Sequence, residues 1–174
     1  VKYAILKMQP QIGVNIEISS EIDIGTGLGG SSAMVASVLA VLNELDPVKK
    51  MNLYEIADLA YQVERIDMKM AGGWQDQYST IFGGFNWIEF NQNEIIVNSL
   101  RIDRDTILEL QFNLMLFRVG SSRKSAEIHQ HNNKKAFVKK SRKEFLDRMS
   151  SNTINIKRAL LKNKVKEFGD YLNS

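Results

Sequence analysis

The sequence predicts an α+β fold with a mixed or antiparallel sheet. Residues 14–19 alternate strictly between apolar and polar side chains, and residues 85–100 contain two β-rich runs around an asparagine-rich turn. Most of the other long segments have helical spacing. Because these segments do not follow a regular strand–helix–strand alternation, a parallel doubly wound sheet is not expected.

The N-terminal elements are predicted from their caps and their breaks. Residues 1–8 are expected to be the end of a helix, since a Gln-Pro pair follows them. Residues 33–45 are apolar and rich in helix formers, which is typical of a buried helix. Asn52 with Glu55 three residues later is a capping-box start, and its helix is expected to end before the glycine pair 72–73.

The second half is expected to begin with a hairpin. A glycine pair precedes a strand at residues 85–90, and the turn after it leads into a partner strand at residues 94–100. Residues 110–119 are expected to form a further strand, bounded by Gly120. From Ser125 onward the pattern predicts two or three helical segments.

The composition is that of an ordinary soluble protein, with 44% hydrophobic and 25% charged residues. No apolar run is long enough for a transmembrane helix, and the first residues lack a signal-peptide layout. The absence of cysteine excludes disulfides, thiolate nucleophiles and Cys-ligated zinc. We therefore expect a cytoplasmic protein without a membrane partner.

The net charge of +3 conceals an asymmetry between the two ends of the chain. Residues 1–100 carry 6 basic and 12 acidic side chains, whereas residues 101–174 carry 17 and 8. The basic cluster at residues 134–143 is open to interpretation as a nucleic-acid surface. A solvated helix face is favoured, because apolar residues interleave with the basic ones at roughly helical spacing. We therefore expect no nucleic-acid partner.

A glycine-rich loop at residues 25–30 predicts a phosphate-binding site. Glycines let backbone N–H groups approach an anion closely, and the helix that follows directs its partial positive charge to the same place. Ser31 and Ser32 can cap that helix or lend hydroxyls to a phosphate or a metal. Four glycines in six residues are more than a turn with a helix cap requires.

Two common phosphate loops do not fit this segment. A Walker A loop requires a lysine after the last glycine, and none follows Gly30. Gly25, Gly27 and Gly30 satisfy the dinucleotide fingerprint, which also requires a second strand about 20 residues further on. Because residues 43–59 have a helical pattern instead, a dinucleotide fold is disfavoured.

The loop resembles the second motif of the GHMP kinases, the class of galactokinase and of homoserine, mevalonate and phosphomevalonate kinases. The family motif is Gly-x-Gly-Leu-Gly-Ser-Ser-Ala. This chain departs from it at two positions: Ile24 stands where a proline usually precedes the motif, and Gly30 stands in place of the first serine. The resemblance implies an ATP-dependent kinase. Its implied ATP-binding residues are Gly25, Thr26, Gly27, Leu28, Gly29, Gly30, Ser31 and Ser32.

A second polar segment surrounds Asp76, which stands between two glutamines after a glycine pair. This composition is poor for a helix or a strand, and it suits a loop that positions a polar group. The carboxylate could act as a general base or fix a substrate hydroxyl. An alternative is that Asp76 caps a short helix at residues 77–82.

In the same region, Gly-Gly-x-Gln-Asp-Gln-Tyr at residues 72–78 and Phe-Gly-Gly-Phe-Asn at 82–86 are similar to the sugar-kinase branch of the class. The similarity is greatest to the heptose 7-phosphate kinases, which phosphorylate an anomeric hydroxyl. By this resemblance Asp76 is the catalytic residue, and Ser31 and Glu64 bind Mg²⁺. The implied substrate-binding residues are Gly73, Gln75, Asp76 and Arg123.

The resemblance implies ATP-dependent transfer to the anomeric hydroxyl of a sugar or sugar phosphate, with a heptose 7-phosphate as the expected acceptor. Another GHMP sugar kinase, similar to galactokinase or fucokinase, is an alternative. A second alternative is a non-catalytic sugar or nucleotide sensor on the same fold. For the oligomeric state, a homodimer is one possibility.

The resemblance also implies the domain organisation. Residues 1–120 correspond to an incomplete N-terminal ATP-binding domain with the ribosomal-protein-S5-like fold, and residues 121–174 to the start of the helical C-terminal domain. The first and third family motifs are not found in the sequence. We therefore expect the chain to be a fragment that is inactive on its own.

Overall fold

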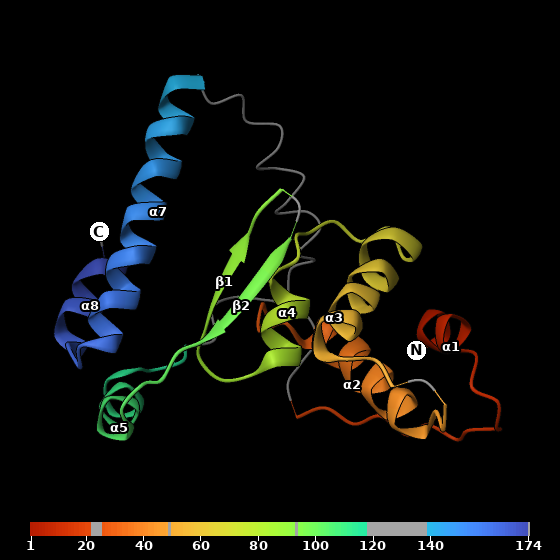
Figure 1. Ribbon diagram of the computed structural model, residues 1–174. Helices are drawn as coiled ribbons and strands as arrows, with labels where there is room; N and C mark the ends of the chain where they lie inside the picture. The colour runs from red at the N-terminus through yellow and green to blue at the C-terminus, as the bar shows by residue number, and fades with distance from the viewer. Residues whose placement is uncertain (22–25, 49, 93, 118–138, 174) are drawn as a thin grey trace. The chain divides into compact units, whose positions relative to one another are not determined.

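The computed structural model describes residues 1–21, 26–48, 50–92, 94–117 and 139–173. The described chain divides into two compact units, one ending at Gly84 and the other beginning at Phe85 (Figure 1). The first unit is helical, and the second combines an antiparallel hairpin with helices. The predicted α+β class is confirmed.

The first unit contains four α-helices and one π-helical segment. These elements are α1 (Lys2–Met8), α2 (Gly30–Leu45), α3 (Leu53–Tyr61), η1 (Gln62–Asp67) and α4 (Gln75–Phe82). The helices predicted near residues 1–8, 33–45 and after Asn52 are confirmed. The predicted capping box is also confirmed, because Asn52 Oδ1 accepts from the Glu55 N–H and Glu55 Oε2 accepts from the Asn52 N–H.

The core of the first unit lies around α2. One face of this helix buries apolar side chains at helical spacing, with Leu39 fully buried at its centre. Side chains from α1, α3 and η1 close the cluster, and its buried members are Ala4, Val35, Val38, Leu39, Leu42, Ile56, Ala60 and Val63. The helix whose first turn follows the glycine loop is therefore firmly anchored.

Residues 14–19 were expected to form a strand, and this prediction is wrong. The segment has no regular secondary structure, and no described strand pairs with it. Val14 and Ile16 are half-buried and pack against the helical core, whereas the residues between and after them are exposed. The alternating pattern therefore reflects one-sided packing of an extended segment on helices.

The second unit begins with the predicted hairpin, β1 (Asn86–Phe90) and β2 (Ile95–Ser99). The strands are antiparallel, with Asn86 opposite Ser99 and Ile88 opposite Val97. Helices α5 (Arg104–Asn113), α7 (Lys139–Leu161) and α8 (Val165–Leu172) follow. The helical pattern predicted from Ser125 onward is confirmed over α7 and α8, and residues 125–138 lie outside the described chain.

The strand predicted at residues 110–119 is wrong where the structure describes it. Residues 110–113 form the end of α5, residues 114–117 have no regular structure, and the rest lies outside the described chain. Asp103 caps α5 by accepting from the Asp105 N–H. Thr106 and Leu110 then share one buried helical face, which outweighs the β-rich composition of the segment.

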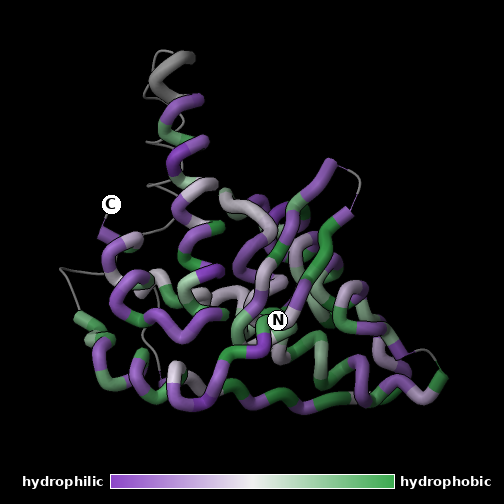
Figure 2. Tube along the Cα trace, turned by 60° about the vertical axis from the view of Figure 1, so that its left-hand side comes forward, coloured by the Kyte–Doolittle hydropathy of each residue, from purple (hydrophilic) through white to green (hydrophobic). Residues whose placement is uncertain are grey.

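The second unit has its own small core. Leu110, Leu160 and Val165 are buried there, and Thr106 Oγ1 donates to Asn163 Oδ1 at 2.8 Å beside them. In both units apolar and polar residues are mixed along the helices (Figure 2). In the described chain, no helix is both long and apolar enough to span a membrane.

Candidate active site

The glycine loop meets α2 in backbone conformations that favour glycine. Gly27 and Gly29 have φ angles of 78° and 73°, a region that residues with a side chain rarely occupy. Gly29 is the N-cap of α2, and no side chain caps the helix there. The first N–H groups of a helix have no intrahelical acceptor, so this end can accept an anion. Gly25, predicted to bind ATP, lies outside the described residues.

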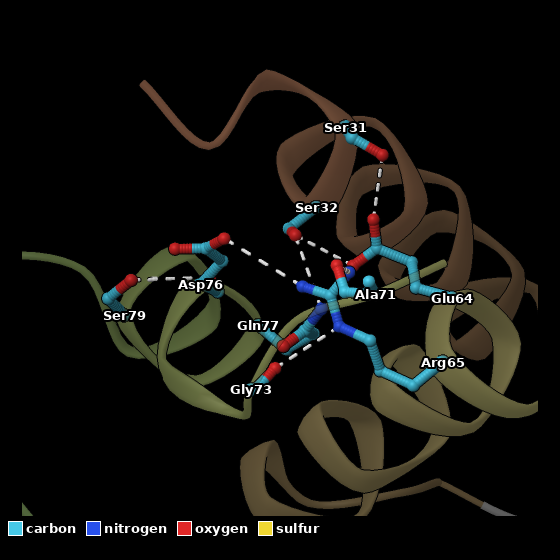
Figure 3. Close-up of polar contacts among 9 residues, drawn as sticks. All are labelled: Ser31, Ser32, Glu64, Arg65, Ala71, Gly73, Asp76, Gln77 and Ser79. Atoms are coloured by element: carbon cyan, nitrogen blue, oxygen red, sulfur yellow. Dashed lines mark hydrogen bonds and ion pairs between the residues drawn. The ribbon is translucent and has the colours of Figure 1, made fainter. Parts of the chain in front are cut away.

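Ser31 and Ser32 occupy the first turn of α2 and do not cap it. Both instead donate to one carboxylate, Ser31 Oγ to Glu64 Oε1 and Ser32 Oγ to Glu64 Oε2, each at 2.7 Å (Figure 3). Ser31 and Glu64, the two residues that the resemblance implies for Mg²⁺ binding, therefore lie in direct contact. The metal expected between them stays a prediction.

Glu64 is fully buried, which is unusual for a carboxylate without a cationic partner. Its remaining contact comes from Gln77, whose Nε2 donates to Glu64 Oε2 and, at 3.3 Å, lies near Ser32 Oγ. Among the described residues, no lysine, arginine or histidine forms an ion pair with it. Neutral donors compensate a buried charge only in part.

These atoms form a donor set that fits Mg²⁺. The ion prefers oxygen ligands and keeps several of its waters, so one carboxylate and a hydroxyl are enough protein ligands. The structure places the Ser31 hydroxyl directly on the Glu64 carboxylate, at 2.7 Å from Oε1. No cluster of three or more His, Cys, Asp or Glu side chains occurs in the described chain, so a site with more acidic ligands is not seen there.

The π-helical segment η1 explains how Glu64 reaches α2. Met68 N–H donates to Val63 O across the wide turn at 3.0 Å, in place of the α-helical pattern. Consecutive side chains then diverge: the Glu64 carboxylate points to the serines of α2, and the Arg65 guanidinium points to the start of α4 (Figure 3). Single π-helical turns occur frequently at functional sites.

Asp76 lies in the first turn of α4, so the prediction that it stands in a loop is wrong. The alternative, that it caps a helix beginning at Gln77, is also wrong, because α4 begins at Gln75 with Trp74 as its N-cap. A carboxylate in a first turn is favourable next to the positive end of a helix, which explains why this sequence is helical. The Asp76 side chain is 53% exposed, and Oδ2 lies 3.8 Å from Arg65 Nη2.

Aromatic packing fixes α4 on the preceding helix. Trp74 stacks on Tyr61 with ring centroids 3.4 Å apart, and Tyr78, four residues after Trp74, is buried. The Tyr78 hydroxyl donates to Asp58 Oδ1 at 2.6 Å. Burial, together with this hydrogen bond, raises the pKa of Tyr78 well above its usual value. Asp76 therefore projects from a firmly docked helix.

The predicted substrate-binding residues are only partly described. Gly73, Gln75 and Asp76 are all exposed and adjacent at the start of α4. Arg123 lies outside the described residues. Sequence reasoning did not assign Arg65 or Gln77 to the site, although Gln77 stands in the motif at residues 72–78 and Arg65 directly follows Glu64. Their contacts depend on the geometry of η1, which the sequence analysis did not predict.

The first unit matches a known family model. Residues 1–84, which contain the glycine loop, the buried carboxylate and Asp76, match the family model "GHMP kinases N terminal domain". The first 84 residues are therefore similar in sequence to the N-terminal domain of GHMP kinases. The first unit of the structure ends at the same residue as the match.

Two curated relatives are kinases of this class. The chain is 36% identical over 156 residues to a D-glycero-alpha-D-manno-heptose 7-phosphate kinase from Campylobacter jejuni, an alignment that covers 87% of this chain and 44% of the relative. It is 42% identical over 77 residues to a mevalonate kinase from Archaeoglobus fulgidus, covering 44% of this chain and 26% of the relative. The chain thus spans less than half the length of these GHMP relatives.

A solved structure shows the same fold. The crystal structure of a D-glycero-D-manno-heptose 1-phosphate kinase from Bacteroides thetaiotaomicron superimposes with a TM-score of 0.65 and 32% sequence identity. The superposition covers 88% of this chain and 44% of the other. The described chain therefore has part of a GHMP kinase fold.

Proposed function

We propose that the protein transfers the terminal phosphoryl group of ATP to the anomeric hydroxyl of a sugar phosphate, with a heptose 7-phosphate as the acceptor. One observation carries the proposal: the buried Glu64 carboxylate is joined to the serines that open the helix after the glycine loop. This arrangement brings a potential metal ligand to a potential phosphate site. The name of the Campylobacter relative supports the choice of acceptor.

In this proposal the glycine loop and the first N–H groups of α2 hold the phosphates of ATP. Ser31 and Glu64 hold Mg²⁺, which when bound would neutralise charge on the phosphates. Phosphoryl transfer depends on positioning and charge neutralisation more than on covalent catalysis, so few catalytic groups are needed. The domains are proposed as residues 1–120 for ATP binding and 121–174 for the start of the C-terminal domain.

Asp76 is proposed as the catalytic residue. Its exposed carboxylate stands in the first turn of α4, beside the exposed Gly73 and Gln75. There it can accept a hydrogen bond from the acceptor hydroxyl, orient that oxygen for attack, and take its proton during transfer. Arg123, with a planar guanidinium suited to bidentate phosphate binding, is proposed to hold the phosphate of the acceptor.

A kinase assay on the full-length protein tests the function. With Mg²⁺ and ATP, a heptose 7-phosphate should be phosphorylated, and galactose, fucose and mevalonate serve as competing acceptors. We expect Asp76→Asn to lower kcat by about 100-fold or more with a small change in the KM for ATP, because general base catalysis contributes at least that factor. Asp170→Asn removes an exposed carboxylate of α8 and is the matched control.

Two outcomes would contradict the proposal. Binding of nucleotide and sugar phosphate without turnover in the full-length protein would indicate a sensor on the kinase fold. Turnover in Asp76→Asn at the wild-type rate would remove Asp76 from the catalytic role and would require another group to orient the acceptor.

A further inference from the structure

Arg65 is a half-buried cation that the proposed chemistry leaves unused. Its side chain is only 10% exposed, although it follows directly after the proposed metal ligand Glu64. The guanidinium points toward the start of α4 (Figure 3). A charged side chain with so little exposure calls for specific partners.

The hydrogen bonds and the ion pair of this guanidinium all involve residues between Ala71 and Asp76. Nε donates to Gly73 O at 3.2 Å, Nη1 donates to Ala71 O at 3.3 Å, and Nη2 lies 3.8 Å from Asp76 Oδ2. One planar group thus contacts two backbone carbonyls and the proposed catalytic carboxylate together. A lysine cannot reproduce this set, because it presents a single point of charge.

The backbone is shaped to receive the guanidinium at Gly72. A Cβ atom there would lie 2.6 Å from Arg65 Cζ and within 2.9 Å of both terminal nitrogens. Gly72 also has a φ of 154°, which a side chain would strain. The glycine therefore allows the loop to close over the flat face of the arginine.

Glu64 and Arg65 each contact a residue in the first turn of α4. Glu64 accepts from Gln77, and the next residue, Arg65, pairs with the preceding residue of α4, Asp76. Two consecutive residues of η1 are thereby joined to two consecutive residues of α4. These contacts connect the proposed metal side of the site directly to the proposed acceptor side.

From these contacts we infer that Arg65 is a positioning residue: it holds residues 71–73 in place and orients the Asp76 carboxylate for the acceptor. The inference rests on the proposed function. Because the Asp76 side chain is half exposed, its ion pair with Arg65 contributes little to folding stability. The effect of Arg65 should therefore appear in turnover more than in stability.

The test compares Arg65→Gln with Arg65→Lys in the full-length enzyme, using kcat, the KM for ATP and the unfolding temperature. Arg65→Gln should lower kcat by about 10-fold or more and leave the KM for ATP within about threefold, since small misplacements of reacting groups are costly. Arg65→Lys keeps the charge and should recover only part of the loss. Arg101→Gln, at an exposed arginine of the second unit, is the control and should match the wild type.

A double-mutant cycle separates positioning from a purely structural role. If Arg65 acts through Asp76, Arg65→Gln should cost little further turnover once Asp76→Asn is present. An equal fractional loss in both backgrounds would overturn the inference, as would an unchanged kcat in Arg65→Gln. A wild-type enzyme that phosphorylates no acceptor would instead contradict the proposed function, so the two failures are distinguishable.

Gly72→Ala provides an independent test that keeps the arginine, in case Arg65→Gln does not fold. The added methyl group would displace the guanidinium, and kcat should fall as it does in Arg65→Gln. Gly13→Ala is the matched control, because an added Cβ there meets no atom within 4 Å. A fully active Gly72→Ala enzyme with its arginine displaced would refute the positioning role.

Discussion

At the scale of single residues, Glu64 is the least ordinary feature of the protein. A fully buried carboxylate held by two hydroxyls and an amide has its hydrogen bonds satisfied but not its charge. A buried charge without a compensating opposite charge lowers the folding stability of the protein. A bound cation would compensate the carboxylate, and the two oxygen ligands available to it, the Glu64 carboxylate and the Ser31 hydroxyl, indicate a hard one.

Glu64→Gln tests this interpretation because it keeps the shape and removes the charge. We expect nucleotide affinity to lose its dependence on Mg²⁺, with metal affinity lower by at least roughly 10-fold to 100-fold, the loss caused by removing even a residue that only supports a metal ligand. Folding should survive, since the serine hydroxyls can rotate to accept from the new amide. Calorimetric titration of ATP with and without Mg²⁺ measures the difference.

Glu44→Gln is the control for this substitution. Glu44 lies at the far end of α2, where its exposed carboxylate pairs with Lys50 at 2.9 Å. This variant should retain the full Mg²⁺ dependence. If Glu64→Gln behaved in the same way, Glu64 would have a structural role only.

At the scale of elements, the junction between the glycine loop and α2 decides what the site can bind. The buried face of α2 fixes the direction of the helix, and the positive φ angles at Gly27 and Gly29 turn the loop back toward its first turn. Neither serine of this turn is used as a cap. The loop and the helix end therefore form one potential anion site, whose shape depends on the backbone more than on side chains.

Gly29→Val should abolish ATP binding while the protein remains folded. A β-branched residue at a φ of 73° is strained, whereas a Cβ at this position meets nothing closer than 4.0 Å. The penalty is therefore conformational, about 1–3 kcal/mol, and the loop relieves it by leaving its present shape. ATP titration together with circular dichroism checks both halves of the expectation.

Gly13→Ala serves again as the comparison, since this glycine has no positive φ and no neighbour within 4 Å of an added Cβ. Its ATP affinity should equal that of the wild type. Wild-type affinity in Gly29→Val would mean that the loop does not enclose the phosphates.

At the scale of the whole molecule, sequence reasoning succeeds where the determinants are local. The capping box at Asn52 and the apolar face of α2 are contained in short segments, so the helices are predictable. The strands expected at residues 14–19 and 110–119 fail, because a strand requires a partner that local alternation does not specify. The role of Arg65 is invisible to sequence reasoning for a related reason: it depends on a π-helical turn.

Each of the two units has its own buried apolar cluster, so we expect each unit to have its own free energy of unfolding. We expect Leu160→Ala, in the smaller cluster, to destabilise the second unit by about 2–5 kcal/mol, the usual cost of such a cavity. The first unit, with its cluster around Leu39, should be affected far less. Leu161→Ala, one residue away and 45% exposed, is the control and should change stability by less than about 0.5 kcal/mol.

Hydrogen exchange of backbone amides reports on both units in one experiment. Leu160→Ala should accelerate exchange in α5, α7 and α8, where its cluster lies, and leave α2 and α3 as slow as in the wild type. The nucleotide site would then stay intact in a protein whose second unit opens readily. Equal acceleration in α2 and α8 would show instead that the molecule unfolds as one cooperative body, in which the helical core around Leu39 depends on contacts beyond its own cluster.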